Sequence, residues 1–249
     1  YQALYANAVT ENSRMNNETG YYLGFNINPF KSWFLNGYFD IFRFPWLRYQ
    51  VNGMSLGYET IAQLIYRPSK TFEAYFRFRQ KNKHLTESSA YTEAPISGIE
   101  NELRNYYRFN LTYNLNKSIK LKNRIEYSRY KRGDRDVEQG FMIYQDISYK
   151  SMGFPLSFSA RLAYFDTESY NSRIYVYESD VLYAYSFPSY YYRGMRAYLV
   201  LQYKIRKNID AWFRVSNQFY SDRETIGSSL ETVDGKSRTD IKVQLRLKF

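Results

Sequence analysis

The stretch Thr239-Asp-Ile-Lys-Val-Gln-Leu-Arg-Leu-Lys-Phe249 ends the chain and alternates in character without a break. One row consists of Thr239, Ile241, Val243, Leu245, Leu247 and Phe249, and the other row, starting at Arg238, is polar or charged throughout. Successive side chains of a β-strand point to opposite faces. The stretch therefore predicts a strand with one apolar face and one charged face.

The end of this stretch carries a further signal in Leu245, Leu247 and Phe249. An apolar row that finishes on a terminal aromatic resembles the closing strand of bacterial outer-membrane β-barrels, in which the final aromatic is part of the assembly signal. This resemblance implies an integral membrane protein of the Gram-negative outer membrane with a periplasmic C-terminus.

The composition favours strands over helices. The 249 residues include 29 Tyr and 18 Phe but few Gly and Pro, and aromatic residues are enriched in strands. No run of about 18 apolar residues exists, which excludes transmembrane helices. The absence of Cys excludes a disulfide framework and Cys-based metal sites. No Gly/Ser or Pro linker divides the chain, so we expect a single domain over residues 1–249, either mature from Tyr1 or the ordered piece of something longer.

The net charge of +11 would point to a polyanionic partner in a soluble protein. In residues 103–114 and 118–130, however, the basic residues alternate with an apolar row. In a soluble sandwich the apolar rows would form the core, whereas in an outer-membrane barrel they meet lipid and the polar rows line the lumen. Alternation alone leaves both possibilities open.

Connection lengths favour the membrane barrel. Strands are predicted at 1–10, 20–28, 32–42, 54–66, 71–81, 102–114, 118–130, 139–149, 154–166, 172–178, 181–188, 194–204, 209–220 and 237–249. Short connections alternate with long polar ones, as in outer-membrane barrels with short periplasmic turns. To preserve this alternation we place a tight turn at Glu178-Ser-Asp180. The expected fold is an all-β, antiparallel transmembrane β-barrel of about 14 strands, with 12 as the alternative.

Aromatic residues near the predicted strand ends support the same fold. Amphipathic rings prefer the membrane interface and form two girdles in outer-membrane barrels. The residues expected to contribute are Tyr21, Trp33, Tyr66, Phe72, Tyr113, Tyr127 and Phe249.

Three segments carry a second resemblance: residues 173–186, the loop Arg223-Glu-Thr-Ile-Gly-Ser228, and the end Gln244-Leu-Arg-Leu-Lys-Phe249. They resemble the C-terminal barrel region of Bacteroidota outer-membrane proteins that carry N-terminal helix-hairpin-helix repeats similar to those of competence proteins. The resemblance implies membrane location and makes a DNA-handling envelope protein one alternative. It transfers no functional residue, and the barrel itself shows no nucleic-acid motif.

The predicted lumen face is basic. Its cations are Arg77, Arg79, Arg104, Arg108, Lys120, Lys122, Arg124, Arg161, Arg196 and Arg214, interleaved with bulky aromatic residues. Clustered cations in a confined wall would favour anions and form a narrow conduit. Alternatively, the cations pair with Asp40, Glu59, Glu73, Glu126, Asp146, Asp210 and Asp240. The lumen is then filled, and the barrel is a membrane anchor or a subunit of a larger envelope assembly.

An outer-membrane hydrolase is the enzymatic alternative, with the single histidine, His84, as general base beside Glu87, Ser88 and Ser89. We expect His84 to lie in a solvated loop, so the prediction is a non-enzymatic protein. Asp134, Asp136 and Glu138 lack the glycine of a Ca²⁺ loop and are interpreted as a solvated charge run. No cofactor or metal is expected. The expected partners are outer-membrane lipid, lipopolysaccharide and other envelope proteins.

Overall fold

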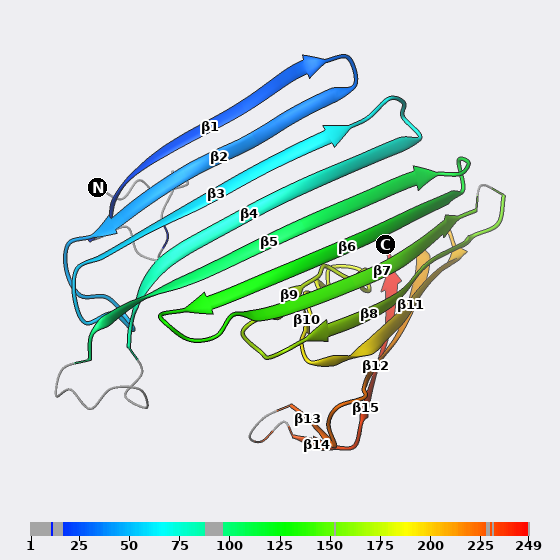
Figure 1. Cartoon of the computed structure of the whole chain (residues 1–249). Helices are drawn as coiled ribbons and strands as arrows, with labels where there is room; N and C mark the ends of the chain where they lie inside the picture. The colour runs from blue at the N-terminus through cyan, green and yellow to red at the C-terminus, as the bar shows by residue number, and fades with distance from the viewer. Residues whose placement is uncertain are drawn as a thin grey trace.

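The computed structural model describes residues 11, 17–87, 97–151, 153–227, 230 and 232–248, and the statements below concern these residues. They form an all-β fold (Figure 1). The strands are β1 (Thr19–Phe30), β2 (Trp33–Phe44), β3 (Ser55–Tyr66), β4 (Phe72–Thr86), β5 (Ile99–Asn114), β6 (Ile119–Arg132), β7 (Glu138–Lys150), β8 (Leu156–Thr167), β9 (Ile174–Tyr175), β10 (Ser189–Tyr190), β11 (Arg193–Arg206), β12 (Ile209–Tyr220), β13 (Thr225–Ile226), β14 (Val233–Asp234) and β15 (Ser237–Leu247). No described helix is long and apolar enough to cross a membrane.

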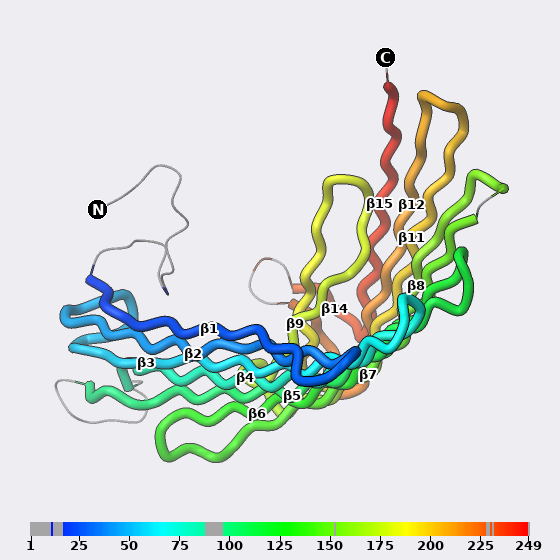
Figure 2. Tube along the Cα trace, turned by 90° about the horizontal axis from the view of Figure 1, so that it is seen from above, coloured from blue at the N-terminus to red at the C-terminus, as the bar shows by residue number. Residues whose placement is uncertain are grey.

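Eleven strands form one antiparallel sheet, called the wall below, in the order β1-β2-β3-β4-β5-β6-β7-β8-β11-β12-β15. The wall curves strongly from β7 to β15, and its two edges, β1 and β15, stand apart (Figure 2). Because every neighbouring pair is antiparallel and the strand number is odd, β1 and β15 run in the same direction. An antiparallel closure of this wall therefore requires an odd number of strands beyond these eleven.

The two faces of the wall differ in chemistry and in exposure. The apolar face carries side chains such as Phe109, Ile125 and Leu162, which are 46%, 40% and 55% exposed. The opposite, polar face buries charged side chains: Glu59, Glu102, Arg124, Glu126, Arg161, Arg196, Asp210 and Arg214. A water-soluble sandwich buries its apolar rows and exposes its charges. The wall does the reverse, which is the arrangement of a membrane barrel.

Short and long connections lie at opposite rims, as the sequence predicted. At the short-turn rim, β1 and β2 are joined by two residues, and Ser32 adopts a positive φ of 71° that matches a tight hairpin turn. Asn116 shapes the β5–β6 turn, because its side-chain oxygen accepts hydrogen bonds from the amides of Ser118 and Ile119, both at 2.8 Å. The strand ends that the long connections join lie at the other rim, called the long-loop rim below; these connections are 45–54, 87–98, 133–137, 168–192 and 221–236.

The prediction of wall strands at 172–178 and 181–188 is wrong. Strand β8 pairs directly with β11, from Arg193↔Asp166 to Tyr203↔Leu156, so residues 168–192 leave the wall and form the β9–β10 hairpin. Short and long connections still alternate between the two rims, because the wall loses two consecutive strands and the following strands keep their predicted directions. Of the 14 expected strands, the one at 1–10 lies outside the described residues, and the single domain over 1–249 stays a prediction.

Aromatic rings gather in two groups on the apolar face. Near the short-turn rim, Tyr66 lies 4.6 Å from Trp33 and 6.2 Å from Phe72, measured between ring centroids. About the middle of the strands, Tyr107 lies 5.2 Å from Phe78 and 6.1 Å from Tyr127. Rings from adjacent strands thus form bands across the wall, although Phe249 lies outside the described residues.

Candidate functional site

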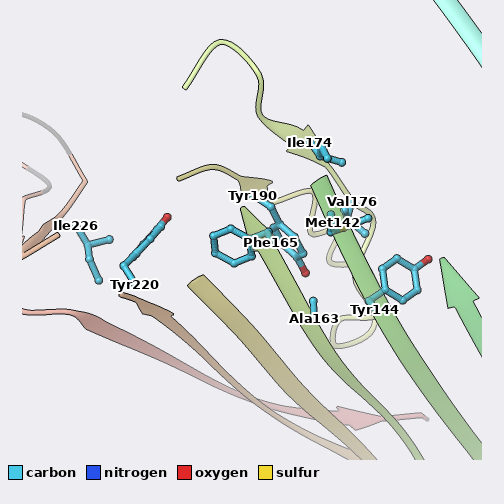
Figure 3. Close-up of a cluster of buried hydrophobic side chains, with 9 residues drawn as sticks. All are labelled: Met142, Tyr144, Ala163, Phe165, Ile174, Val176, Tyr190, Tyr220 and Ile226. Carbon is cyan, nitrogen blue, oxygen red and sulfur yellow. The ribbon is translucent and has the colours of Figure 1, made fainter. Parts of the chain in front are cut away.

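Residues 168–192, called the inner segment below, fold onto the polar face of the wall on its concave side (Figure 2). Ile174 and Val176 point to the wall and are 0% and 1% exposed, whereas Tyr175 and Tyr177 point away and are about half exposed. The buried side chains join a cluster with β7, β8 and β12 (Figure 3): Met142, Tyr144, Ala163, Phe165, Ile174, Val176, Tyr190, Tyr220 and Ile226. Apolar packing therefore fixes the first part of the segment against the wall.

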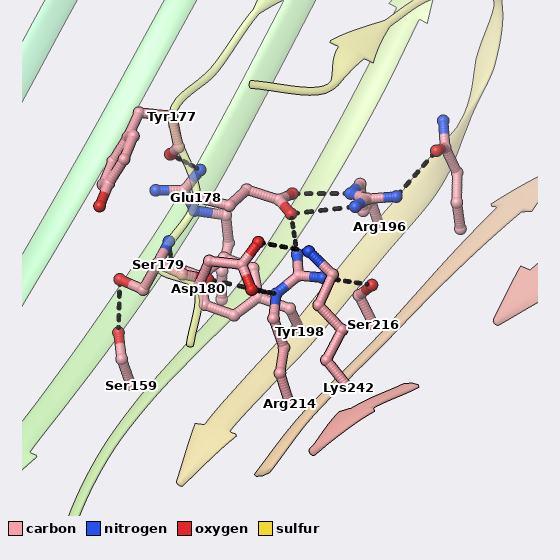
Figure 4. A network of polar contacts seen from close by, with 12 residues as sticks. Ser159, Tyr177, Glu178, Ser179, Asp180, Arg196, Tyr198, Arg214, Ser216 and Lys242 are labelled. Carbon is pink, nitrogen blue, oxygen red and sulfur yellow. Dashed lines mark hydrogen bonds and ion pairs between the residues drawn. The ribbon is translucent and has the colours of Figure 1, made fainter. Parts of the chain in front are cut away.

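Glu178 is the most completely paired carboxylate of the inner segment, with a fully buried side chain. Arg196 of β11 approaches it through two nitrogens, at 2.6 Å to Oε1 and 2.9 Å to Oε2. Arg214 of β12 donates to Oε2 at 2.7 Å, and the Tyr190 hydroxyl donates to Oε1 at 2.7 Å. One carboxylate thus connects the segment to two adjacent wall strands (Figure 4).

Asp180 extends this contact to a third wall strand. Its Oδ2 lies 2.7 Å from Nζ of Lys242 in β15, and its Oδ1 lies 3.7 Å from Nε of Arg214 (Figure 4). The backbone of the segment is bound as well, since the Tyr177 carbonyl accepts a 2.8 Å hydrogen bond from Arg161 of β8. Cations from four wall strands therefore hold residues 177–180.

Two small wall residues make room for the start of the segment. The Ser128 hydroxyl donates to the Ser172 carbonyl oxygen at 2.6 Å. Gly140 lies beside the same carbonyl, and a Cβ on this glycine would stand 2.6 Å from that oxygen. A side chain at Gly140 would therefore displace the segment from the wall.

The ten basic residues predicted to line a lumen all share the polar face, as the strand register shows. Seven of them pair with carboxylates: Arg79 with Glu59, Arg104 with Glu102, Arg108 and Arg124 with Glu126, Arg161 with Asp146, and Arg196 and Arg214 with Glu178. Within the described ranges, Arg77, Lys120 and Lys122 have no carboxylate oxygen within 4.0 Å. That these residues line an open lumen stays a prediction.

Sequence reasoning missed several of the carboxylates that bind these cations. Of the carboxylates expected to pair with the ten cations, Glu59, Glu126 and Asp146 do so. Glu73, Asp210 and Asp240 pair with other cations, namely Arg67, Arg246 and Arg238. Among the described residues, no cationic nitrogen lies within 4.0 Å of a carboxylate oxygen of Asp40. Glu178 was interpreted as part of a turn at the rim, and Glu102 was not considered. The available signal was that Glu178 shares the alternation row of Ile174 and Val176, which the structure buries.

His84 lies on strand β4 and not in a loop, because β4 continues to Thr86. Its Nδ1 accepts a 3.2 Å hydrogen bond from the Leu56 amide, so this nitrogen is occupied. Ser88 and Ser89 lie outside the described residues, and no hydrogen bond joins His84 to Glu87 within the described part. The geometry therefore gives no support to a hydrolytic triad at His84.

The remaining predicted residues lie on β15 and in the β6–β7 connection. Leu245 and Leu247 point to the apolar face and are 59% and 52% exposed, while their assembly role stays a prediction. Near Asp134 and Asp136, Glu138 accepts a hydrogen bond from Asn171 of the inner segment at 3.3 Å. Within the described residues, no group of three or more His, Asp or Glu side chains is placed to hold a metal ion.

Taken together, the wall and the inner segment define an antiparallel sheet of the outer-membrane barrel type. No family model and no curated protein matches the chain, and the resemblance to Bacteroidota proteins with helix-hairpin-helix repeats stays a prediction. The ferric-catecholate import receptor Fiu from E. coli K12 is similar in its open form (TM-score 0.50) and its closed form (TM-score 0.52), each at 10% identity over 92% of this chain.

The chain spans about half the length of Fiu, covering 49% of the open-form chain and 46% of the closed-form chain. The KdgM porin, solved in complex with disordered oligogalacturonate, matches over 93% of this chain and 95% of its own at 15% identity and a TM-score of 0.33. At these identities the likeness to Fiu concerns the fold alone.

Proposed function

We propose that this protein is an integral outer-membrane β-barrel protein that acts as a narrow, anion-favouring conduit, constricted by its inner segment. The observation that carries the proposal is the reversal of the two faces: the apolar face of the wall exposes its side chains, and the polar face buries charged side chains. In a bilayer this arrangement is favourable for both kinds of side chain, because the apolar face contacts lipid and the charged side chains of the polar face are screened from it.

The proposed orientation follows from the two rims. Outer-membrane barrels place short turns in the periplasm and longer loops outside. Strand β15 ends at the short-turn rim, so the C-terminal end would face the periplasm. Lipid would contact the apolar face, and lipopolysaccharide would surround the long-loop rim.

The inner segment supports a constriction rather than a wide pore. It occupies the polar face of β7, β8, β11 and β12, where it buries the cations that would otherwise be free. The polar face of β4 to β6 keeps Arg77, Lys120 and Lys122 without a described carboxylate within 4.0 Å. Unpaired cations on a confined surface attract anions, which supports an anion preference.

Conductance in planar lipid bilayers tests the proposal. The unmodified protein should give a steady conductance with anion preference. Replacing residues 174–190 with a short Gly-Ser linker should raise the conductance, because it removes the constriction. Shortening the β13–β14 connection within residues 227–232 leaves Ile226 of the buried cluster in place, so this variant is the matched control and should leave the conductance unchanged. No conductance from either the unmodified protein or the linker variant would contradict the proposal.

A membrane anchor or assembly subunit is the second candidate. The observation that favours it is the complete burial of Glu178 and the apolar cluster beneath the inner segment, which fill this part of the polar face. An anchor would show no conductance and would co-purify with other envelope proteins in mild detergent.

A further inference from the structure

A second feature of the polar face lies at the short-turn rim, away from the inner segment's ion pairs. A cavity of about 310 Å³, called the rim cavity below, is lined by β4, β5 and β6 and by the turn before β4. Its polar lining includes Lys70, Asn110, Thr112, Asn114, Lys120 and Lys122. The rim cavity therefore gathers three lysines and several neutral hydrogen-bonding groups in one hollow.

The lysines of the rim cavity have no described counter-charge. The one carboxylate in its lining, Glu73, is bound to Arg67, with Nε at 2.7 Å from Oε2. Lys122 faces Asp146 in the strand register, but both Asp146 oxygens are occupied by Arg161 at 2.5 and 2.7 Å. Among the described residues, no carboxylate oxygen lies within 4.0 Å of Lys70, Lys120 or Lys122.

The cations near the long-loop rim behave differently. Lys81 lies 3.1 Å from Glu59, and Lys83 lies 3.2 Å from Glu102. Arg132 lies 2.6 Å from Glu100. Basic residues at the short-turn rim also find partners, since Arg67 pairs with Glu73, and Arg246 and Lys248 pair with Asp210. The three lysines of the rim cavity, in contrast, have no such partner among the described residues, and a purely structural role, in which every cation balances a carboxylate, does not explain them.

A larger hollow continues from the rim cavity along the polar face. It measures about 800 Å³, shares Thr71, Asn114 and Lys120 with the rim cavity, and extends to Ser159 and Gln202 of the next strands. Its lining adds Lys117 and Lys150 at the rim and, deeper in, hydroxyl and amide groups together with the carboxylate of Asp180, which is paired with Lys242 at 2.7 Å. A small solute can therefore reach the lysines from the concave side of the wall.

We propose that the rim cavity binds a small anionic solute through its carboxylate or phosphate groups, with Lys120 and Lys122 as the main contacts. This inference rests on the proposed function, since it assigns a binding site to the periplasmic mouth of the conduit. Lysine supplies a mobile point charge with three donors, and Thr112 and Asn114 add neutral hydrogen bonds. The cavity opens on the polar face, opposite the side in contact with lipid, so the ligand is a dissolved anion and not a lipid headgroup.

Isothermal titration calorimetry on the detergent-solubilised chain tests the site, with citrate and inorganic phosphate as anionic probes and maltose as a neutral one. Citrate should bind saturably, and maltose should not. The double variant Lys120→Gln/Lys122→Gln should weaken citrate binding by at least about tenfold, or about 1.4 kcal/mol in binding free energy, because it removes two charge-assisted hydrogen bonds.

Two further variants keep this experiment decisive. Lys31→Gln/Lys207→Gln removes the same charge from two other turns of the same rim and should leave the affinity within about twofold. Lys120→Arg/Lys122→Arg keeps the charge and should retain binding, which shows that these positions tolerate substitution. Equal loss in both Gln pairs, or equal binding of citrate and maltose, would overturn the proposal.

The conduit and the site can fail separately. Saturable citrate binding without any conductance in bilayers would support the binding site and contradict the proposed conduit. Conductance with no saturable binding of citrate or phosphate would support the conduit and contradict the binding site.

Discussion

Neighbouring residues of one strand show the two environments most clearly. On β6, Ile125 is 40% exposed on the apolar face, while Arg124 and Glu126 on either side of it are buried and paired with each other. An exposed Ile between two buried charges is costly in water, because it leaves apolar surface solvated and desolvates ions. In a bilayer the same residue contacts hydrocarbon and the charges are screened from it.

The cost of a charge on the apolar face should depend on its depth. Ile125→Arg, in the middle of β6, should destabilise the protein by about 2 to 4 kcal/mol, whereas Ile119→Arg, at the first residue of the same strand and face, should cost about 0 to 1 kcal/mol. Urea unfolding in lipid vesicles measures both. Equal costs would show that this face does not span the hydrocarbon.

Glu178 should matter more than any exposed carboxylate. Glu178→Gln should cost about 3 to 5 kcal/mol, because it leaves Arg196 and Arg214 buried beside a neutral group. The matched control Glu224→Gln removes a pair with Lys236 at an exposed position and should cost less than about 1 kcal/mol. The free energies of unfolding in urea give the comparison, and a cost for Glu178→Gln as small as that of the control would contradict the ion-pair description.

At the scale of elements, the inner segment separates what sequence could predict from what it could not. Wall strands such as β6 and β12 were predicted within a few residues, because alternation is a local property. Residues 172–188 alternate in the same way, yet they leave the sheet and pack against its concave, polar face. Their position depends on Arg196, Arg214 and Lys242, which are distant in sequence, so no local pattern indicated it.

The candidate site was therefore predicted in part. The basic residues of the polar face follow from alternation, and the register places all ten together. Which cations pair depends on strand order, and this explains why Lys122, which faces Asp146, loses that partner to Arg161. The rim cavity required the three-dimensional arrangement.

Cysteine cross-linking tests the direct pairing of β8 with β11. Ala160 and Leu199 are register partners on the apolar face, and the chain has no native Cys. Ala160→Cys/Leu199→Cys should form an intramolecular disulfide on oxidation. Ala160→Cys/Val215→Cys, one strand further away, should not. If residues 172–188 were wall strands, the first pair would lie too far apart to react.

For the whole molecule, the central question is which medium contacts each face of the wall. Eleven strands present one continuous apolar face, and both edges, β1 and β15, run in the same direction. An open edge leaves backbone groups unpaired, which hydrocarbon does not tolerate. In the membrane, antiparallel closure would require an odd number of further strands, which gives the even strand count of single-chain bacterial barrels.

Site-directed spin labelling along β6 tests this description most directly, using single cysteines from Lys120 to Arg129 in the protein reconstituted in lipid vesicles. Collisions with oxygen, which concentrates in lipid, should peak at Leu121, Asn123, Ile125 and Tyr127 and fall at the positions between them, which face the interior. Low oxygen accessibility at Ile125, combined with high accessibility to a water-soluble nickel reagent, would contradict the description.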